Sequence, residues 1–120
     1  MISLVFPGQG SQKVTMGLDL YENFDLAKDI FKKADEILNY NISDIILNGP
    51  QEKLNQTTFT QPAIYLIGYV ICKILKEKTK FFEKDINYLA GHSLGEYTAL
   101  TVAQSISFEQ GLILLKNRGE

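Results

Sequence analysis

The sequence contains little of what would create disulfides, metal sites or strong electrostatic attraction. Its 120 residues include one cysteine, one histidine and no tryptophan, so Cys72 has no partner for an intrachain disulfide. The 12 basic and 14 acidic side chains give a net charge of -2, which offers no electrostatic reason to expect nucleic acid or an anionic membrane as a partner. We therefore expect no metal, no nucleic acid and no membrane, and instead a small molecule or another protein.

Long apolar runs are lacking as well. No basic and apolar leader precedes Phe6, and the apolar run over residues 63–72 is too short to cross a bilayer. Together with the unpaired Cys72, this favours a reducing, cytoplasmic setting. The length and the 45% hydrophobic content suit one compact domain or part of one.

Strand and helix patterns alternate along the chain. Residues 2–6 form a short β-type run that stops at a Pro-Gly-Gln-Gly sequence, and residues 86–90 predict a second strand. Helices are expected where apolar residues recur every three or four positions or follow a capping residue: 25–38, 43–47, 51–54, 60–75, 96–103 and 107–118. The class is α/β, and two strands do not complete a parallel sheet.

Two helix starts are marked by particular residues. Thr60 and Pro62 predict a start with a threonine cap and a proline in the first turn. Ser107 and Gln110 have the spacing of a capping box, which predicts that the last helix begins there.

The segment Gly91-His-Ser-Leu-Gly95 stands between an expected strand and an expected helix. This is the context of the nucleophile elbow, in which a sharp turn between small residues exposes the serine oxygen. Ser93 is then a candidate nucleophile, and the Leu94 amide with the following helix dipole would stabilise the oxyanion of a tetrahedral intermediate. The alternative is an ordinary glycine-rich turn in which Ser93 caps the next helix.

His92 stands directly beside Ser93 and is the only histidine. Consecutive residues leaving a strand point to opposite sides, so its imidazole should lie away from the serine oxygen. We interpret His92 as a packing or supporting residue. No other residue is suited to general-base work near neutral pH, so we expect the base to lie outside these 120 residues.

Four motifs follow one another along the chain: Phe6-Pro-Gly-Gln-Gly-Ser-Gln12, Thr60-Gln-Pro-Ala63, Gly91-His-Ser-Leu-Gly-Glu-Tyr97 and Arg118. In order and spacing they resemble malonyl-CoA:acyl carrier protein transacylases, the acyltransferase family of fatty acid and polyketide synthesis. The resemblance runs over residues 2–120 and covers only the N-terminal part of the family's usual length. It implies the N-terminal portion of an α/β-hydrolase-like acyltransferase core, with the parallel sheet incomplete in this chain.

The resemblance also implies roles for individual residues. Ser93 would take malonyl from coenzyme A as an ester and pass it to the phosphopantetheine thiol of acyl carrier protein in fatty acid biosynthesis, with malonyl-CoA as substrate and no bound cofactor. The backbone amides of Gln9 and Leu94 would form the oxyanion hole. Gln61 and Pro62 would be structural residues at the start of the buried helix, and the alternative for Gln61 is that it borders the pocket.

Arg118 would bind the malonyl carboxylate through two parallel hydrogen bonds. It follows Leu114 by four and Leu115 by three residues, which places it toward the apolar side of the expected helix. Without the resemblance, the same position favours a cation that interacts with the free carbonyl groups at the end of a helix.

The family's catalytic histidine and its ferredoxin-like small subdomain come later in the sequence, and neither is expected within residues 1–120. We therefore expect a truncated acyltransferase large subdomain that is inactive alone. Two alternatives stay open: a serine esterase or patatin-like hydrolase with the same serine motif, and a fragment that only binds coenzyme A, a carrier protein or a complementary chain. Such a fragment would expose a sheet edge and an apolar patch.

Overall fold

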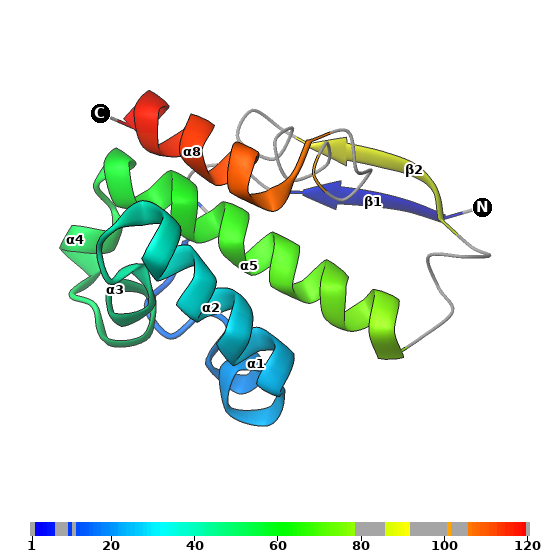
Figure 1. The fold of residues 1–120 in the computed structure, drawn as a ribbon, viewed down its shortest axis with the longest axis horizontal. Coiled ribbons are helices and arrows are strands. Elements are labelled where there is room, and N and C mark those ends of the chain that lie inside the picture. The colour runs from blue at the N-terminus through cyan, green and yellow to red at the C-terminus, as the bar shows by residue number, and fades with distance from the viewer. Residues whose placement is uncertain are drawn as a thin grey trace.

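The computed structural model describes residues 2–6, 10, 12–78, 86–91, 101 and 106–119. Within these ranges a layer of helices packs beside two strands (Figure 1). The elements are β1 (Ile2–Phe6), α1 (Leu18–Asn23), α2 (Asp25–Leu38), α3 (Ile42–Asn48), α4 (Gln51–Leu54), α5 (Thr57–Lys78), β2 (Ile86–Gly91) and α8 (Phe108–Gly119). Both expected strands are confirmed, and β2 ends one residue later than expected.

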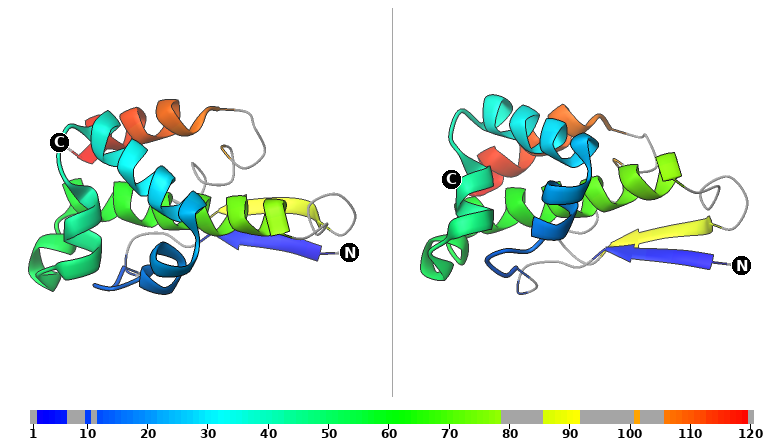
Figure 2. Two further views of the ribbon diagram at one scale, coloured as in Figure 1. Left: turned by 60° about the horizontal axis from the view of Figure 1, so that its bottom comes forward. Right: turned by 90° about the horizontal axis from the view of Figure 1, so that it is seen from below.

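The two strands pair in parallel. Their register runs from Ile2 opposite Ile86 to Phe6 opposite Gly91, with an irregularity between Ile2 and Ser3. Parallel neighbours need a long crossover, and here that crossover contains α1 to α5. Figure 2 (right) shows α5 between the strands on one side and α2 on the other. Both strands therefore end at the same edge of the sheet.

Helix α2 has the amphipathic pattern that its sequence predicts. Its buried residues recur every three or four positions, and the helix ends at Asn39, which adopts a left-handed conformation with φ of 64°. The Asp35 carboxylate accepts hydrogen bonds from the Ser43 amide at 2.9 Å and from the Ser43 hydroxyl at 2.8 Å, which ties α2 to the start of α3. The buried residues are Ala27, Ile30, Phe31, Ala34 and Leu38.

Helix α5 begins earlier than the sequence indicates. It starts at Thr57, so Pro62 lies inside the helix and Thr60 is not its cap. Proline has no N–H to donate to the carbonyl four residues before it, and that carbonyl, of Thr58, accepts the Tyr40 hydroxyl at 3.4 Å instead. The Thr60 hydroxyl lies 2.9 Å from the Gln56 carbonyl oxygen of the preceding turn and also contacts that of Leu54. The expected helix start at Thr60 is therefore wrong.

By length and composition, residues Thr57–Glu77 of α5 would suffice to cross a membrane. In the structure this helix packs against α2, α3, α4 and α8. Seven consecutive residues, 60–66, are buried. Helix α5 is therefore the central core helix of the described part of the chain.

Helix α1 was not expected from the sequence. It follows Gly17, which adopts a left-handed conformation with φ of 79°. A Cβ at Gly17 would lie 2.5 Å from Cδ1 of Ile67 on α5, so glycine also permits close packing at this point. The helices expected over 43–47 and 51–54 are confirmed as α3 and α4. The helix expected over 96–103 lies outside the described residues except for Thr101, which is helical.

Candidate active site

The candidate site is defined by the common edge at which β1 and β2 end. Phe6 and Gly91 are register partners in the last pair of the sheet. Gln9 follows Phe6 by three residues and Ser93 follows Gly91 by two. The strands that precede the two motifs therefore end side by side, which is where groups at the carboxyl ends of parallel strands are expected to meet. Gln9, His92, Ser93 and Leu94 themselves lie outside the described residues, and their roles stay predictions.

Arg118 lies in the last turn of α8. The capping box at the start of this helix is confirmed: the Gln110 amide donates to Ser107 Oγ at 3.0 Å, and the Ser107 amide donates to Gln110 Oε1 at 2.9 Å. Leu115 is fully buried, whereas Leu114 is 49% exposed. Leu115 therefore marks the buried face of α8 and Leu114 does not, and the expected position of Arg118 toward the apolar side stays a prediction. The Arg118 side chain is outside the described part, and its role stays a prediction.

A buried junction joins α5, α8 and the segment that follows Ser93. The Tyr65 hydroxyl lies 2.7 Å from Thr101 Oγ1 and donates to the Phe108 carbonyl oxygen at 3.0 Å. Burial raises the pKa of Tyr65, although the Thr101 hydrogen bond acts in the opposite direction. Tyr65 therefore stays a neutral phenol that holds Thr101, eight residues after Ser93, against the core.

Gly111 makes this junction possible. A Cβ at this position would lie 2.2 Å from the Tyr65 hydroxyl oxygen and 2.7 Å from its Cζ. The Tyr65 ring also stacks on Phe108, with centroids 5.4 Å apart. Sequence reasoning missed both Tyr65 and Gly111. The one available signal was a glycine inside the expected helix over 107–118, because a glycine there indicates a close approach of another group.

A chain of amide hydrogen bonds holds the residues that follow Gln9. The Gly10 amide donates to Gln12 Oε1 at 2.8 Å, and Gln12 Nε2 donates to Asn55 Oδ1 at 3.0 Å. Gln51 Nε2 donates to the same Asn55 oxygen at 2.8 Å, and the Val14 amide donates to Gln51 Oε1 at 2.8 Å. Gln12 belongs to the Pro-Gly-Gln-Gly-Ser-Gln motif, but sequence reasoning assigned it no role.

Gln61 lies on the same face of α5 as Tyr65, one turn earlier. Its side chain is 6% exposed, and its Oε1 has no hydrogen-bond partner among the described residues. A buried amide oxygen without a donor is unfavourable by roughly 1–3 kcal/mol. This position suits a pocket-bordering residue, which stays a prediction.

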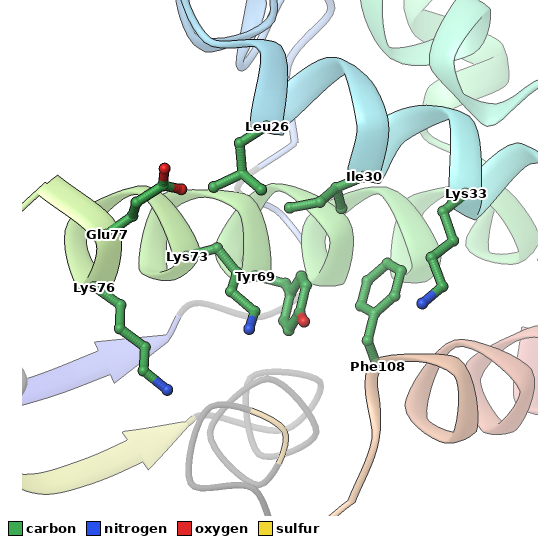
Figure 3. Close-up of a pocket in the computed structure, with 8 residues that line it drawn as sticks. All are labelled: Leu26, Ile30, Lys33, Tyr69, Lys73, Lys76, Glu77 and Phe108. Carbon is green, nitrogen blue, oxygen red and sulfur yellow. The ribbon is translucent and has the colours of Figure 1, made fainter.

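The structure also contains a pocket of about 350 Å³ between α2, α5 and the start of α8 (Figure 3). Its lining includes Tyr69 and Phe108, whose rings stack with centroids 4.3 Å apart. Three lysines and one glutamate stand around it, so its charge suits an anion better than a cation. The described lining residues, none of which the sequence singled out as catalytic or substrate-binding, are Leu26, Ile30, Lys33, Tyr69, Lys73, Lys76, Glu77 and Phe108.

Cys72 is a free, buried thiol on α5. Burial raises its pKa to about 11, so it is protonated near neutral pH and is a poor nucleophile. Among the residues that the structure describes, no group of three or more histidine, cysteine, aspartate or glutamate side chains could hold a metal ion.

Comparison with known proteins identifies the class to which this architecture belongs. The family model described as acyl transferase domain matches residues 3–120. The chain therefore belongs to the acyl transferase domain family, and its parallel strands and helices are part of an α/β acyltransferase core.

Several similar proteins are named as malonyl CoA-acyl carrier protein transacylases. The chain is 47% identical to the polyketide biosynthesis malonyl CoA-acyl carrier protein transacylase PksC of Bacillus subtilis, over 100% of this chain and 40% of that protein. It is 39% identical to the malonyl CoA-acyl carrier protein transacylase of Haemophilus influenzae, over 98% of this chain and 37% of that protein. The chain thus spans about 40% of the length of these two relatives.

Solved structures give the same result. The acyl-carrier-protein S-malonyltransferase of Bartonella henselae superposes with a TM-score of 0.93 and 38% identity, over 99% of this chain and 38% of that one. A malonyl-transacylase solved in complex with a type II polyketide synthase acyl carrier protein superposes with a TM-score of 0.91 and 40% identity, over 98% of this chain and 37% of that one.

Proposed function

We propose that this chain forms the N-terminal portion of the large, α/β-hydrolase-like subdomain of a malonyl-CoA:acyl carrier protein transacylase. The observation that carries the proposal is the pairing of the two strands: β1 and β2 are parallel and end together, and in the sequence they stand immediately before the Gln9 and Ser93 segments. The family match over residues 3–120 and the malonyl-transfer names of its relatives support it. The sheet edge and the helical layer then supply the nucleophile, the oxyanion hole and the carboxylate site.

The proposed reaction is a ping-pong acyl transfer at Ser93. Ser93 Oγ attacks the thioester carbonyl of malonyl-CoA and gives its proton to a general base, while the amides of Gln9 and Leu94 bind the oxyanion. Collapse of the intermediate breaks the C–S bond, and the coenzyme A thiolate takes up the proton. The phosphopantetheine thiol of acyl carrier protein then attacks the Ser93 ester, and the same steps in reverse order release malonyl-carrier protein.

The general base of this reaction is proposed to lie outside these 120 residues. His92 would leave the strand on the side opposite to Ser93, and Cys72 is buried with a pKa of about 11. A histidine and the small ferredoxin-like subdomain of the family would come from sequence that this chain does not contain. The complete protein would work in a reducing, cytoplasmic setting. Its partners would be malonyl-CoA and acyl carrier protein, and it would have no resident cofactor.

Ser93→Ala tests the proposal directly in the complete transferase that contains this segment. The variant should lose transfer of radiolabelled malonyl from coenzyme A to carrier protein, because no oxygen remains to form the ester. The acylated serine should also be visible in the unaltered protein as a mass increase of one malonyl group on the peptide that contains Ser93. Transfer retained by the variant would overturn the proposal.

Arg118→Ala tests the carboxylate site separately. Loss of a bidentate, charge-assisted pair should lower kcat/KM for malonyl-CoA by at least tenfold and leave transfer from acetyl-CoA, which has no carboxylate, within about twofold. Equal losses for malonyl-CoA and acetyl-CoA would contradict the assigned role.

Of the alternatives, the comparisons do not favour a serine esterase, which would hydrolyse simple esters without exchanging thioesters.

A further inference from the structure

The residues after Gln9 are held by the four amide hydrogen bonds that run from α4 to Gly10. Asn55 Oδ1 accepts from both Gln12 Nε2 and Gln51 Nε2, so it fixes two side-chain amides at once. Each of these amides then uses its own oxygen to accept a backbone N–H, from Gly10 and Val14 respectively. In each of the four bonds an N–H group donates to a side-chain amide oxygen. The bonds therefore determine the orientation of all three side-chain amides.

The anchoring continues beyond Val14. The Thr15 amide donates to the Ile46 carbonyl oxygen of α3 at 2.7 Å, and Thr15 adopts an unusual φ of 75°. A β-branched residue in this conformation is strained, so its surroundings must hold it there. Contacts with α3 and with Asn55 at the end of α4 thus hold Gly10 and residues 12–15.

The first bond of this chain acts on the peptide that joins Gln9 to Gly10. Gly10 has φ of 110°, a backbone conformation that residues other than glycine rarely adopt. The Gly10 N–H donates to Gln12 Oε1, and because a peptide unit is planar, such a bond limits the rotation of the peptide to which this N–H belongs. The proposed oxyanion donor, the Gln9 amide, is separated from that plane by only the two rotatable bonds of Gln9.

We propose that Gln12 is a positioning residue for the oxyanion hole, and that it acts together with Asn55 as a bracket that fixes the Gln9 amide. This inference rests on the proposed function, because it assigns to Gln9 the stabilisation of the tetrahedral intermediate. Donors that are fixed before the reaction stabilise developing charge without reorganising, whereas a donor that must be ordered during the reaction stabilises it less.

Variants of Gln12 separate its two bonds. Gln12→Ala removes both, whereas Gln12→Glu keeps the oxygen that accepts from Gly10 and loses the donor to Asn55. Asn55→Ala breaks the link to α4 and leaves Gln12 in place. Gln56→Ala is the matched control, because it is an exposed glutamine beside Asn55 that is not part of this chain of bonds.

The variants should differ in kcat for malonyl transfer, measured in the complete transferase. Removing an oxyanion donor altogether lowers kcat by roughly 10²–10³, so loosening one should lower it by about tenfold in Gln12→Ala. The loss should be equal for malonyl-CoA and acetyl-CoA, with KM within about twofold, because the oxyanion is common to both substrates. Gln12→Glu and Asn55→Ala should lose less than Gln12→Ala, and Gln56→Ala should match the unaltered enzyme.

Amide hydrogen exchange at Gly10 provides a second measurement, which needs no catalysis. The Gly10 amide should be protected in the unaltered protein and in Gln12→Glu, and should exchange faster in Gln12→Ala. Unchanged exchange in Gln12→Ala, or an unchanged kcat with faster exchange, would overturn the inference. A transferase that forms no malonyl-Ser93 ester in any variant would instead refute the proposed function and leave the exchange result standing.

Discussion

Replacing Gly111 with alanine should destabilise the chain, although alanine is the better helix former. The new Cβ would lie 2.2 Å from the Tyr65 hydroxyl oxygen, 2.7 Å from its Cζ and 3.2 Å from Thr101 Oγ1. Cβ atoms in proteins essentially never approach another heavy atom within 3.0 Å, so Tyr65 or α8 must move. Tyr65 is fully buried and therefore has no open space into which it can turn.

The magnitude follows from three contributions. Overpacking a tight core costs about 1–3 kcal/mol. Displacing the Tyr65 hydroxyl also breaks its hydrogen bond to the Phe108 carbonyl or to Thr101, and a buried group left unpaired costs about 1–3 kcal/mol. The higher helix propensity of alanine returns about 1 kcal/mol. We expect Gly111→Ala to lower the free energy of unfolding by about 1–5 kcal/mol.

Urea denaturation followed by circular dichroism measures this loss. Asn117→Ala, an exposed position on the same helix, is the control and should change stability by less than about 0.5 kcal/mol. Tyr65→Phe combined with Gly111→Ala removes the nearest clashing atom, so the double variant should lose less than the sum of the two single losses. A Gly111→Ala protein that is as stable as the original would refute this account of the junction.

Three further predictions concern stability. Ser107→Ala should lower the free energy of unfolding by about 1 kcal/mol in urea denaturation, because the capping box at the start of α8 loses its acceptor. Asp35→Ala should cost about 1–3 kcal/mol in the same assay, since Ser43 loses both of its hydrogen bonds to the carboxylate. The folded-state pKa of Cys72 lies above its ordinary value of 9.0, so the stability that depends on its protonation should be present below pH 9 and be lost as the pH rises toward 11. Cys72→Ala should reduce that loss in denaturation curves measured between pH 8 and 11.

The sequence predicts the elements that are defined by local pattern. The spacing of Ala27, Ile30 and Phe31 was sufficient for α2, and the Ser107–Gln110 pair was sufficient for the start of α8, because both depend on residues three or four positions apart. The start of α5 was missed because Pro62 is tolerated inside the helix, where the Tyr40 hydroxyl supplies a partner for Thr58. Such a partner comes from the connection between α2 and α3 and has no local signal around Pro62.

The candidate site divides in the same way. The serine and glycine motifs at 91–95 and the Gln9 loop are recognisable from sequence, and the structure confirms that the strands preceding them pair in parallel. The packing of Tyr65 over Gly111 and the link from Gln12 to Asn55 join residues that are 46 and 43 positions apart. Contacts of this kind depend on tertiary packing, which no periodicity or spacing rule describes.

The parallel pairing of the strands also has a consequence for the order of folding. Phe6 and Gly91 are 85 positions apart in the sequence, whereas the contacts among α1 to α5 join residues that are less far apart. Closing so long a loop is entropically unfavourable until the crossover is compact, so the helical layer should form first and the strand pair last. In pulse-labelled hydrogen exchange during refolding, the amides of α2 and α5 should gain protection before those of β2. The edge from which Gln9 and Ser93 emerge would then be among the last parts of the protein to assemble.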